Sequence, residues 1–324
     1  MKCYRCGKPA DTILSDSNLP VCKLCFSNYI ERKVIKTIRH YKMLKYNDTI
    51  GIAYSGGKDS VVLLHILYKI EQSFPQSKVI VITIDEGIRG YREEALKVVR
   101  KNVDLLDVEW HLFSFKELYG HTLDEILSKA AELAMKNNKK RLSACTYCGI
   151  LRRKALDYAA KELGVTKLAA GHNLDDETQT LLINLLKGDV DRIGRLMPIH
   201  DQTTRVLVPR IKPLRKVSER EVVLYAYYNG LEYQSRTCPY AAESIRSDVR
   251  LFLNEIEKKI PSVKHNLLHA LDTLSPLLRK QQEKELKYCK HCGYPTSQDL
   301  CKSCILLSKL NLLDKQRINF FQKI

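Results

Sequence analysis

The sequence predicts an α/β protein whose main domain is a parallel sheet of the Rossmann type, with a small cysteine-rich module at each end of the chain. Short apolar strands alternate with helical segments through the middle of the chain, which is the pattern of βαβ units. A glycine-rich loop, SGGKDS, directly follows the first strand. Ten of the eleven cysteines fall into five C-x-x-C pairs, two near each end of the chain and one in the middle.

Four strands are expected in the sheet: Thr49–Ser55, Lys78–Asp85, Val108–Phe115 and Lys167–His172. Helices are expected at Asp59–Gln72, Tyr91–Leu106 and Leu123–Met135, and again before and after the fourth strand. Parallel sheets of this kind bind their ligands at the carboxyl ends of the strands. The loop Ser55–Ser60, Asp85 and the Gly171-His172 pair are therefore expected to share one edge of the sheet.

The rest of the chain is predicted to be largely helical. SERE, Ser218–Glu221, has the form of a capping box and opens a helix that Gly230 should end. Ser244 to Lys280 also reads as helix, broken at Pro261, with Ser262 available to cap the next helix. The expected domains are an N-terminal zinc module (1–27), a basic linker helix (28–47), a catalytic domain (48–240), a helical extension (241–286) and a C-terminal zinc module (287–324).

The composition favours a soluble protein with a polyanionic partner. The 324 residues include 54 Lys and Arg against 37 Asp and Glu, a formal charge of +17. Nucleic acid is the usual partner of such an excess, and a merely basic surface is the alternative. No apolar run approaches the ~20 residues of a membrane span, and the N-terminus lacks the apolar segment of a signal peptide. We expect a cytoplasmic protein with no membrane association.

The terminal cysteines have the spacing of zinc sites. The first quartet has the form C-x2-C-x15-C-x2-C, and in the last one eight residues separate the two pairs. Two thiol pairs without metal are the alternative. Neither segment is long enough to bury a core alone, so bound metal is expected to supply most of its folding free energy. The expected ligands are Cys3, Cys6, Cys22 and Cys25 for one Zn²⁺, and Cys289, Cys292, Cys301 and Cys304 for the other.

The SGGKDS loop predicts a phosphate-binding site. It is not a Walker loop, because Asp59 rather than Ser or Thr follows Lys58. Gly56 and Gly57 allow the backbone to approach an anion closely, and the following helix points free N–H groups at it. Asp59 either helps to hold Mg²⁺ or caps the helix, and the Ser55 and Ser60 hydroxyls are further ligands. An ordinary glycine-rich turn is the alternative.

The middle cysteines, Cys145 and Cys148, have no partner pair, and the only cysteine left is Cys238. Three thiolates can bind a [4Fe–4S] cluster with one iron left open, or carry sulfur as a persulfide and disulfide relay. Three unconnected buried thiols are the third reading. From Lys136 to Lys154 seven residues are basic and none is acidic. This segment contacts nucleic acid, neutralises ATP and a thiolate cluster, or is a solvated helix face.

Another candidate site is GHNLDDE, which places Asp175 and Asp176 together at the head of a helix after the fourth strand. Capping by Asn173 or Asp175 explains one of these polar side chains. A double acid after a strand end is more than a cap requires.

SGGKDS, CTYCGILRR and GHNLDDETQ, with the two flanking quartets, resemble the TtcA/TtuA family of tRNA 2-thiolation enzymes, which belong to the N-type ATP pyrophosphatases. The resemblance covers essentially the whole chain and is nearest to the TtuA-like archaeal and eukaryotic cytosolic 2-thiouridine branch. It implies an adenine nucleotide α-hydrolase-like fold whose SGGKDS segment is called the PP-loop. It also implies an enzyme that cleaves ATP to AMP and pyrophosphate.

The resemblance implies roles for individual residues. Cys145, Cys148 and Cys238 match the family's cluster ligands, and these three with Asp59 and Asp176 match its catalytic positions. Arg152 stands where the branch often has a lysine that meets ATP, so the charge is kept but the geometry differs. The implied ATP contacts are Ala53, Ser55, Gly56, Gly57, Lys58, Asp59, Ser60, Ile84, Arg152, Gly171 and Asp176.

The implied reaction is adenylation of C2 of a tRNA uridine, at position 34 or 54, followed by insertion of sulfur held at the open iron of the cluster. ATP, Mg²⁺, a [4Fe–4S] cluster and two Zn²⁺ are the implied cofactors. Sulfide or a thiocarboxylated ubiquitin-like protein is the implied sulfur donor, and a homodimer is an open possibility. The alternatives are 2-thiolation of a tRNA cytidine, a non-catalytic tRNA-binding protein with the same metal sites, and a glutamine-fed ligase, for which we see no glutaminase segment.

Overall fold

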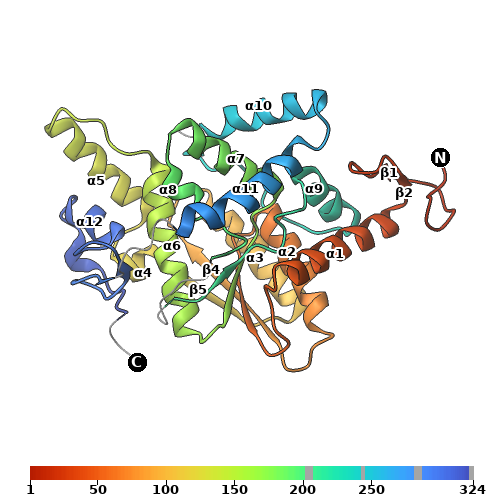
Figure 1. Ribbon diagram of the computed structural model, residues 1–324. Helices are drawn as coiled ribbons and strands as arrows, with labels where there is room; N and C mark the ends of the chain where they lie inside the picture. Colours follow the sequence, from red (N-terminus) through yellow and green to blue (C-terminus); the bar gives the residue numbers. More distant parts are fainter. Residues whose placement is uncertain (201–206, 242–244, 281–286, 321–324) are drawn as a thin grey trace.

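The computed structural model describes residues 1–200, 207–241, 245–280 and 287–320, and its centre is a six-stranded sheet in the order β5-β4-β3-β6-β8-β7. The first five strands in this order run parallel, and β7 at the edge runs antiparallel to β8. Figure 1 shows the sheet surrounded by helices, with β1 and β2 at one end of the molecule and α12 at the other. The strands are β3 (Thr49–Ala53), β4 (Lys78–Asp85), β5 (Trp110–Ser114), β6 (Lys167–Ala170), β7 (Ile199–His200) and β8 (Arg210–Ile211).

The sheet buries both of its faces, as expected for nearly continuous apolar strands. Side chains of a strand alternate between the faces, so Val79 and Val81 of β4 pack in one core while Ile80 and Ile82 pack in another. Helices α1 (Lys23–His40), α2 (Lys58–Glu71), α3 (Arg92–Leu106) and α9 (Glu219–Tyr228) contribute to the first core. Helices α4 (Phe115–Tyr119), α5 (Leu123–Lys136), α6 (Ala144–Glu162) and α12 (Lys302–Ser308) contribute to the second.

The strand order reverses between β3 and β6. From β3 the chain moves outward through β4 to β5, and it then returns to the other side of β3 to form β6. Ala53 at the end of β3 lies in register with Ala170 at the end of β6. The loops that follow these two strands therefore leave the sheet side by side, which is where ligands of open α/β sheets bind.

The helical half of the chain covers this edge. Helices α7 (Leu174–Leu186), α8 (Val190–Ile193) and α11 (Val263–Lys280) share a third small core. Helix α10 (Arg246–Lys259) lies along α7, as Figure 1 shows. No helix within the described residues is long and apolar enough to span a bilayer.

The terminal modules are not independent of the main domain. Each holds a two-residue hairpin, β1 (Thr12–Ile13) with β2 (Pro20–Val21), and β9 (Lys287–Tyr288) with β10 (Pro295–Thr296). Cys22 and Cys25 at the start of α1 join the same core as Phe26. At the other end, Leu306 and Leu307 of α12 pack into the core that contains α6. Both modules therefore gain stability from burial against the domain.

The structure confirms the α/β class with its parallel sheet, and it refines several predicted elements. Strands β3 and β6 end two residues earlier than predicted, because the chain leaves the sheet there to build the site loops. The strand predicted at Val108–Phe115 spans only Trp110–Ser114, and Phe115 begins α4. Strands β7 and β8 were not predicted, since two residues are too few to show a period.

The predicted helix boundaries are mostly close to the observed ones. The Ser218 capping box forms with Glu221, and the chain turns at Gly230 with a φ of 63°. Ser262 does not have the extended backbone of an N-cap, because its φ is 65°, so the predicted cap is wrong. Ser244, where the next helical stretch was predicted to begin, lies outside the described residues.

Candidate functional site

The PP-loop lies between β3 and α2, with its backbone shaped around the start of the helix. Gly57 is the N-cap of α2 in an extended conformation. Gly56 has a φ of 85°, and a Cβ there would lie 3.1 Å from both the Ala95 carbonyl oxygen and a Val99 methyl group. Glycine is therefore required at position 56 by both conformation and space. The resulting turn leaves the first N–H groups of α2 directed at an anion.

Two carboxylates hold the ammonium of Lys58. Its Nζ lies 2.9 Å from Asp59 Oδ2 and 2.9 Å from Glu219 Oε1, the latter at the head of α9. Burial would lower the pKa of Lys58, but these two ion pairs raise it above the ordinary lysine range. Lys58 is therefore fully charged at neutral pH, at the position where a phosphate would meet the loop.

The loop after β6 reaches the PP-loop through Asn173. The Asn173 side chain donates to Asp59 Oδ1 at 2.8 Å, and its Oδ1 accepts from Asp176 N at 2.9 Å as the N-cap of α7. Gly171 also lies against the first turn of α2, because a Cβ there would come within 3.0 Å of the Asp59 carbonyl carbon. Backbone atoms cannot yield to such a contact, so residue 171 must be glycine for the two loops to meet.

The two predicted aspartates have different surroundings. Asp175 is buried, and its carboxylate accepts from Lys264 Nζ at 2.5 Å and from Glu219 N at 2.7 Å, which joins α7, α11 and α9. Asp176 faces the PP-loop. Burial and then the neighbouring charge of Asp59 raise the pKa of Asp176 to about 6. Asp175 therefore holds three helices together, and only Asp176 lies at the PP-loop site.

Glu86 connects the PP-loop edge with the middle cysteines. It is buried directly after β4, and its carboxylate lies 3.0 Å from Arg92 Nε and 3.3 Å from Arg152 Nη1. Arg92 in turn donates to the carbonyl oxygens of Ser55 at 3.1 Å and Ile84 at 2.9 Å. The electrostatic interaction with nearby Cys148 is the main cause that raises the pKa of Arg152.

Cys145, Cys148 and Cys238 lie at one end of α6. Cys145 is exposed, Cys148 and Cys238 are half-buried, and Cys145 Sγ lies 4.0 Å from the carbonyl oxygen of Tyr240. Burial raises the pKa of Cys148 to about 12, with Cys238 and Cys145 adding to the shift, so the three thiols are close enough to interact. Among the described residues they do not form a group with all sulfurs within 4.8 Å, as single metal sites do. As a donor set, three thiols are suited to an iron–sulfur cluster, in which each thiolate binds a different iron.

The two terminal quartets do meet the geometry of single-ion sites. In each, the four sulfur atoms lie within 4.8 Å of one another, and all eight thiols are free of disulfides. Buried Lys154 of α6 places its Nζ 3.5 Å from Cys304 Sγ and 2.9 Å from Gln316 Oε1. A buried ammonium beside a set of thiolates offsets part of their negative charge.

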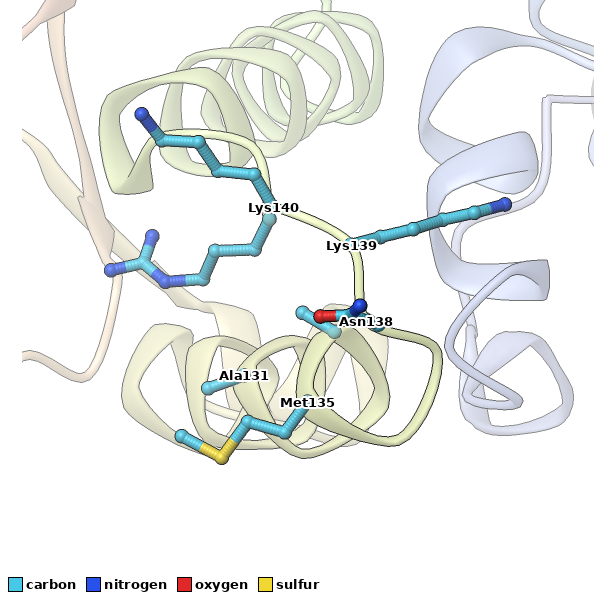
Figure 2. A pocket seen from close by; sticks show the side chains of 7 residues that line it. Ala131, Met135, Asn138, Lys139 and Lys140 are labelled. Carbon is cyan, nitrogen blue, oxygen red and sulfur yellow. The ribbon is translucent and has the colours of Figure 1, made fainter.

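The predicted basic segment serves more than one environment. Lys154 is buried beside the C-terminal cysteines, whereas Arg152 contacts Glu86 with its side chain still 49% exposed. Lys139, Lys140 and Arg141 line a shallow depression of about 450 Å³ formed by the end of α5 and the loop that follows it. Figure 2 shows Lys139 and Lys140 extending away from each other at its rim.

A second basic surface, which the sequence did not reveal, is a groove of about 700 Å³ beside the N-terminal module. Asp16 is its one acidic residue, and the Tyr29 hydroxyl donates to that carboxylate. Lys33 is also engaged, at 2.8 Å from Glu221 in the first turn of α9. The lining residues are Tyr4, Arg5, Asp16, Tyr29, Arg32, Lys33, Lys36, Thr37, His40, Lys216, Ser262 and His265.

A parallel sheet whose strand order reverses at a strand–SGGKDS–helix unit defines a PP-loop ATP-binding domain. The family model described as PP-loop domain matches residues 27–256. "Cytoplasmic tRNA 2-thiolation protein 1" of Chlamydomonas reinhardtii is 39% identical over 293 residues, covering 90% of this chain and 79% of the relative. The Danio rerio protein of the same name is 37% identical over 294 residues, covering 90% and 82%.

One solved structure resembles the whole chain. It is described as "U34-tRNA thiolase NcsA from Methanococcus maripaludis with its [4Fe-4S] cluster", with a TM-score of 0.83 and 33% identity, covering 98% of this chain and 99% of that one. The chain belongs to the PP-loop family of tRNA 2-thiolation proteins.

Most of the site residues predicted from the sequence lie in two neighbouring regions, one at the start of α2 and one beside the three middle cysteines. Lys58, Asp59, Gly171 and Asp176 surround the start of α2, and Arg152 stands between Glu86 and the three cysteines. Glu86, Arg92 and Glu219 were missed. Glu86 directly follows Asp85 at a strand end, so the strand-end rule would have found it. Glu219 lies inside the SERE segment, where the capping box accounted only for Ser218 and Glu221.

We expect the purified protein to hold two metal ions in its terminal quartets, one in each. Cys301→Ser should reduce this content to one, because removing one of four thiolates opens a tetrahedral site. It should also lower the thermal stability, since α12 packs on the main core. Metal analysis with thermal denaturation tests this, and Ser308→Ala, at an exposed position of the same helix, is the matched control. A metal content unchanged by Cys301→Ser would contradict the assignment.

Proposed function

We propose that this protein is an ATP-dependent tRNA 2-thiouridine synthetase that acts on uridine 34 in the cytoplasm. The observation that carries the proposal is a series of contacts that leads from the PP-loop toward the cysteines. It runs from the Ser55 carbonyl through Arg92 and Glu86 to Arg152, whose charge interacts with Cys148. The activation of a base and the delivery of sulfur would thus take place in adjoining parts of one site.

In the first step, the C2 oxygen of the uridine attacks the α-phosphate of ATP and pyrophosphate leaves. Lys58 and the N–H groups at the head of α2 would stabilise the charge that develops on the phosphates. Asp59 and Asp176, whose charges interact, are the carboxylates suited to hold Mg²⁺. Ala53 and Ile84 lie at the ends of β3 and β4, Gly171 follows β6, and Ser60 lies in the first turn of α2. We place the rest of the nucleotide among them. Adenylation converts a poor leaving oxygen into AMP.

Cys145, Cys148 and Cys238 would hold a [4Fe–4S] cluster. When bound, this group would supply an iron site without a protein ligand, at which a sulfide can be kept for transfer to C2. Arg152 would offset the negative charge of the thiolates and lies on the path from the nucleotide. The solved relative, which is described with its [4Fe-4S] cluster, supports this choice. Sulfide or a thiocarboxylated ubiquitin-like protein would be the donor.

The terminal quartets would hold Zn²⁺. Four thiolates in a closed tetrahedral set are typical of structural zinc, which completes the fold and takes no part in the reaction. Position 34 is favoured over position 54 by the solved relative, which is described as a U34-tRNA thiolase. Formation of 2-thiocytidine, or of 2-thiouridine at position 54, by the purified protein would instead favour the other members of the family.

The basic groove beside the N-terminal module is the surface we propose for the tRNA backbone. It combines Arg5, Arg32, Lys36 and Lys216 with the exposed ring of Tyr4, and its acidic residue is engaged with Tyr29. It extends to Lys33, which contacts the first turn of α9, the helix whose Glu219 holds Lys58. Phosphate contacts there would orient the RNA toward the PP-loop without reading its sequence.

Lys58→Ala should reduce tRNA-dependent pyrophosphate release on the order of 10²–10³-fold, since the substitution removes a charged group that stabilises the phosphates. The fold should remain, because Lys58 is only partly buried. Coupled detection of pyrophosphate and of orthophosphate from ATP distinguishes adenylation from ordinary hydrolysis. Wild-type protein that releases orthophosphate would show the proposed chemistry to be wrong.

Protein prepared without oxygen should be brown and carry about four irons, the content of one cubane cluster. Cys238→Ala should remove colour, iron and 2-thiouridine formation while ATP binding remains, because Cys238 lies away from the PP-loop contacts. Iron analysis and mass spectrometry of tRNA nucleosides test this. An iron-free preparation that makes 2-thiouridine at the full rate would favour a persulfide relay instead.

Arg32→Glu with Lys36→Glu should weaken tRNA binding at least tenfold. Both residues are exposed on α1, and the log–log salt slope should fall by roughly 0.7 to 0.9 for each phosphate that the variant no longer neutralises. The matched control is Lys258→Glu with Lys259→Glu, the same charge change on α10. Filter binding over a salt series measures both pairs. Equal reductions in affinity in the two double variants would mean that overall charge, not the groove, determines the affinity.

A further inference from the structure

Helix α10 brings two arginines to the PP-loop site that no sequence motif marked. Arg246 and Arg250 are four residues apart, so they lie on the same face of the helix. This face meets the first turns of α7 and α9, because Arg246 contacts Asp176 and Arg250 lies near Glu219. Both contacted carboxylates belong to the surroundings of the PP-loop.

Arg246 makes several contacts at the head of α7. Its Nη1 lies 3.4 Å from Asp176 Oδ1 and 3.2 Å from Gln179 Oε1, and its Nη2 donates to Thr180 Oγ1 at 3.0 Å. The contact with Asp176 is long for a charge-assisted hydrogen bond, which is ordinarily about 2.7–2.9 Å. The Arg246 side chain is 42% exposed, so its guanidinium is accessible to a ligand.

Arg250 and Lys58 share one carboxylate oxygen. Glu219 Oε1 lies 2.9 Å from Lys58 Nζ and 3.9 Å from Arg250 Nη1. The Arg250 side chain is 49% exposed, and its distance from Glu219 makes this a weak ion pair. Arg250 is therefore held near the PP-loop with most of its donors available.

Three cations thus form ion pairs with three carboxylates beside the PP-loop. Lys58, Arg246 and Arg250 contact Asp59, Asp176 and Glu219, at the heads of three helices. Helix heads favour anions, and guanidinium groups bind phosphate through two parallel hydrogen bonds. A polyphosphate placed here would give the cations better partners than the long carboxylate contacts, and the carboxylates would be free to ligate Mg²⁺.

We propose that Arg246 and Arg250 form a clamp for the pyrophosphate end of ATP. On binding, the two guanidinium groups leave Asp176 and Glu219 and contact the β- and γ-phosphates opposite Lys58. The clamp deepens the proposed function, since it assigns residues to the group that adenylation releases. The helical extension is thereby part of the nucleotide site and not only a support for α7.

Titration of the full-length protein with inorganic pyrophosphate, MgATP and AMP, each without tRNA, tests the clamp. Arg246→Ala and Arg250→Ala should each weaken pyrophosphate and ATP binding about tenfold or more, the effect typical of removing a charge-assisted hydrogen bond. AMP binding should stay unchanged, because AMP lacks the two clamped phosphates. Lys258→Ala, on the exposed side of α10, is the control and should match the wild type for all three.

Arg246 also joins α10 to α7, so Arg246→Ala can affect folding, and Arg246→Lys and Arg250→Ala keep the test decisive. Arg246→Lys retains the charge and should recover part of the pyrophosphate affinity. Arg250→Ala removes only one long ion pair, so its thermal stability should equal that of the control. Pyrophosphate affinity unchanged in a folded Arg250→Ala protein would overturn the clamp. So would equal reductions in affinity for AMP and pyrophosphate, or an effect confined to tRNA binding.

The clamp and the proposed function fail in different ways. Pyrophosphate affinity is measured without tRNA, sulfur or turnover, so it does not depend on thiolation. Wild-type protein that binds pyrophosphate through the two arginines but forms no 2-thiouridine would leave the clamp intact and reject the proposed function. Wild-type protein that forms 2-thiouridine, together with arginine variants that bind pyrophosphate as the wild type does, would support the proposed function and reject the clamp.

Discussion

The parallel pairing of β3 with β6 is the constraint on which the site depends. Because Ala53 is in register with Ala170, the PP-loop and the Gly171–Asp176 loop leave the sheet as neighbours. Side chains of one loop can therefore reach the other directly. Asn173 can then cap α7 and hold Asp59 with the same side chain. The absence of a Cβ at Gly171 allows the second loop to lie against the first turn of α2. A shift of one residue between these strands would turn each side chain to the other face and separate the two loops.

Around this pairing, the protein arranges cations beside thiols and carboxylates. Arg92 links the PP-loop to Glu86, Arg152 contacts Glu86 on the side of Cys148, and Lys154 lies beside Cys304. Arg92 and Lys154 are buried and would be costly to bury alone, and each has a negative or negatively polarised partner within a few ångströms. The strong net positive charge of the chain therefore has an internal component as well as the basic groove on the surface.

The sequence predicts the local features well and the long-range ones poorly. The four main strands, the Ser218 capping box and the two cysteine quartets follow from periodicity and spacing, which act over a few residues. Strands β7 and β8 could not be predicted from the sequence, because two residues show no hydrophobic period. The roles of Glu219 and Arg246 could not be predicted either, because their partners, Lys58 and Asp176, lie far away in the chain. The Lys136–Lys154 segment looks like one basic stretch, yet the turns of α6 send its residues in different directions, one of them inward.

Helix α6 has Cys145 and Cys148 in its first turns and Lys154 two turns later, against the C-terminal quartet. Without negatively charged thiolates around it, the Lys154 ammonium would depend on its hydrogen bond to Gln316 inside a dry environment. The middle of α6 would then be destabilised, and with it the frame that sets where its first turns lie. Helix α6 therefore joins the C-terminal quartet mechanically to Cys145 and Cys148, so that the packing around Lys154 helps to determine where these two thiols lie.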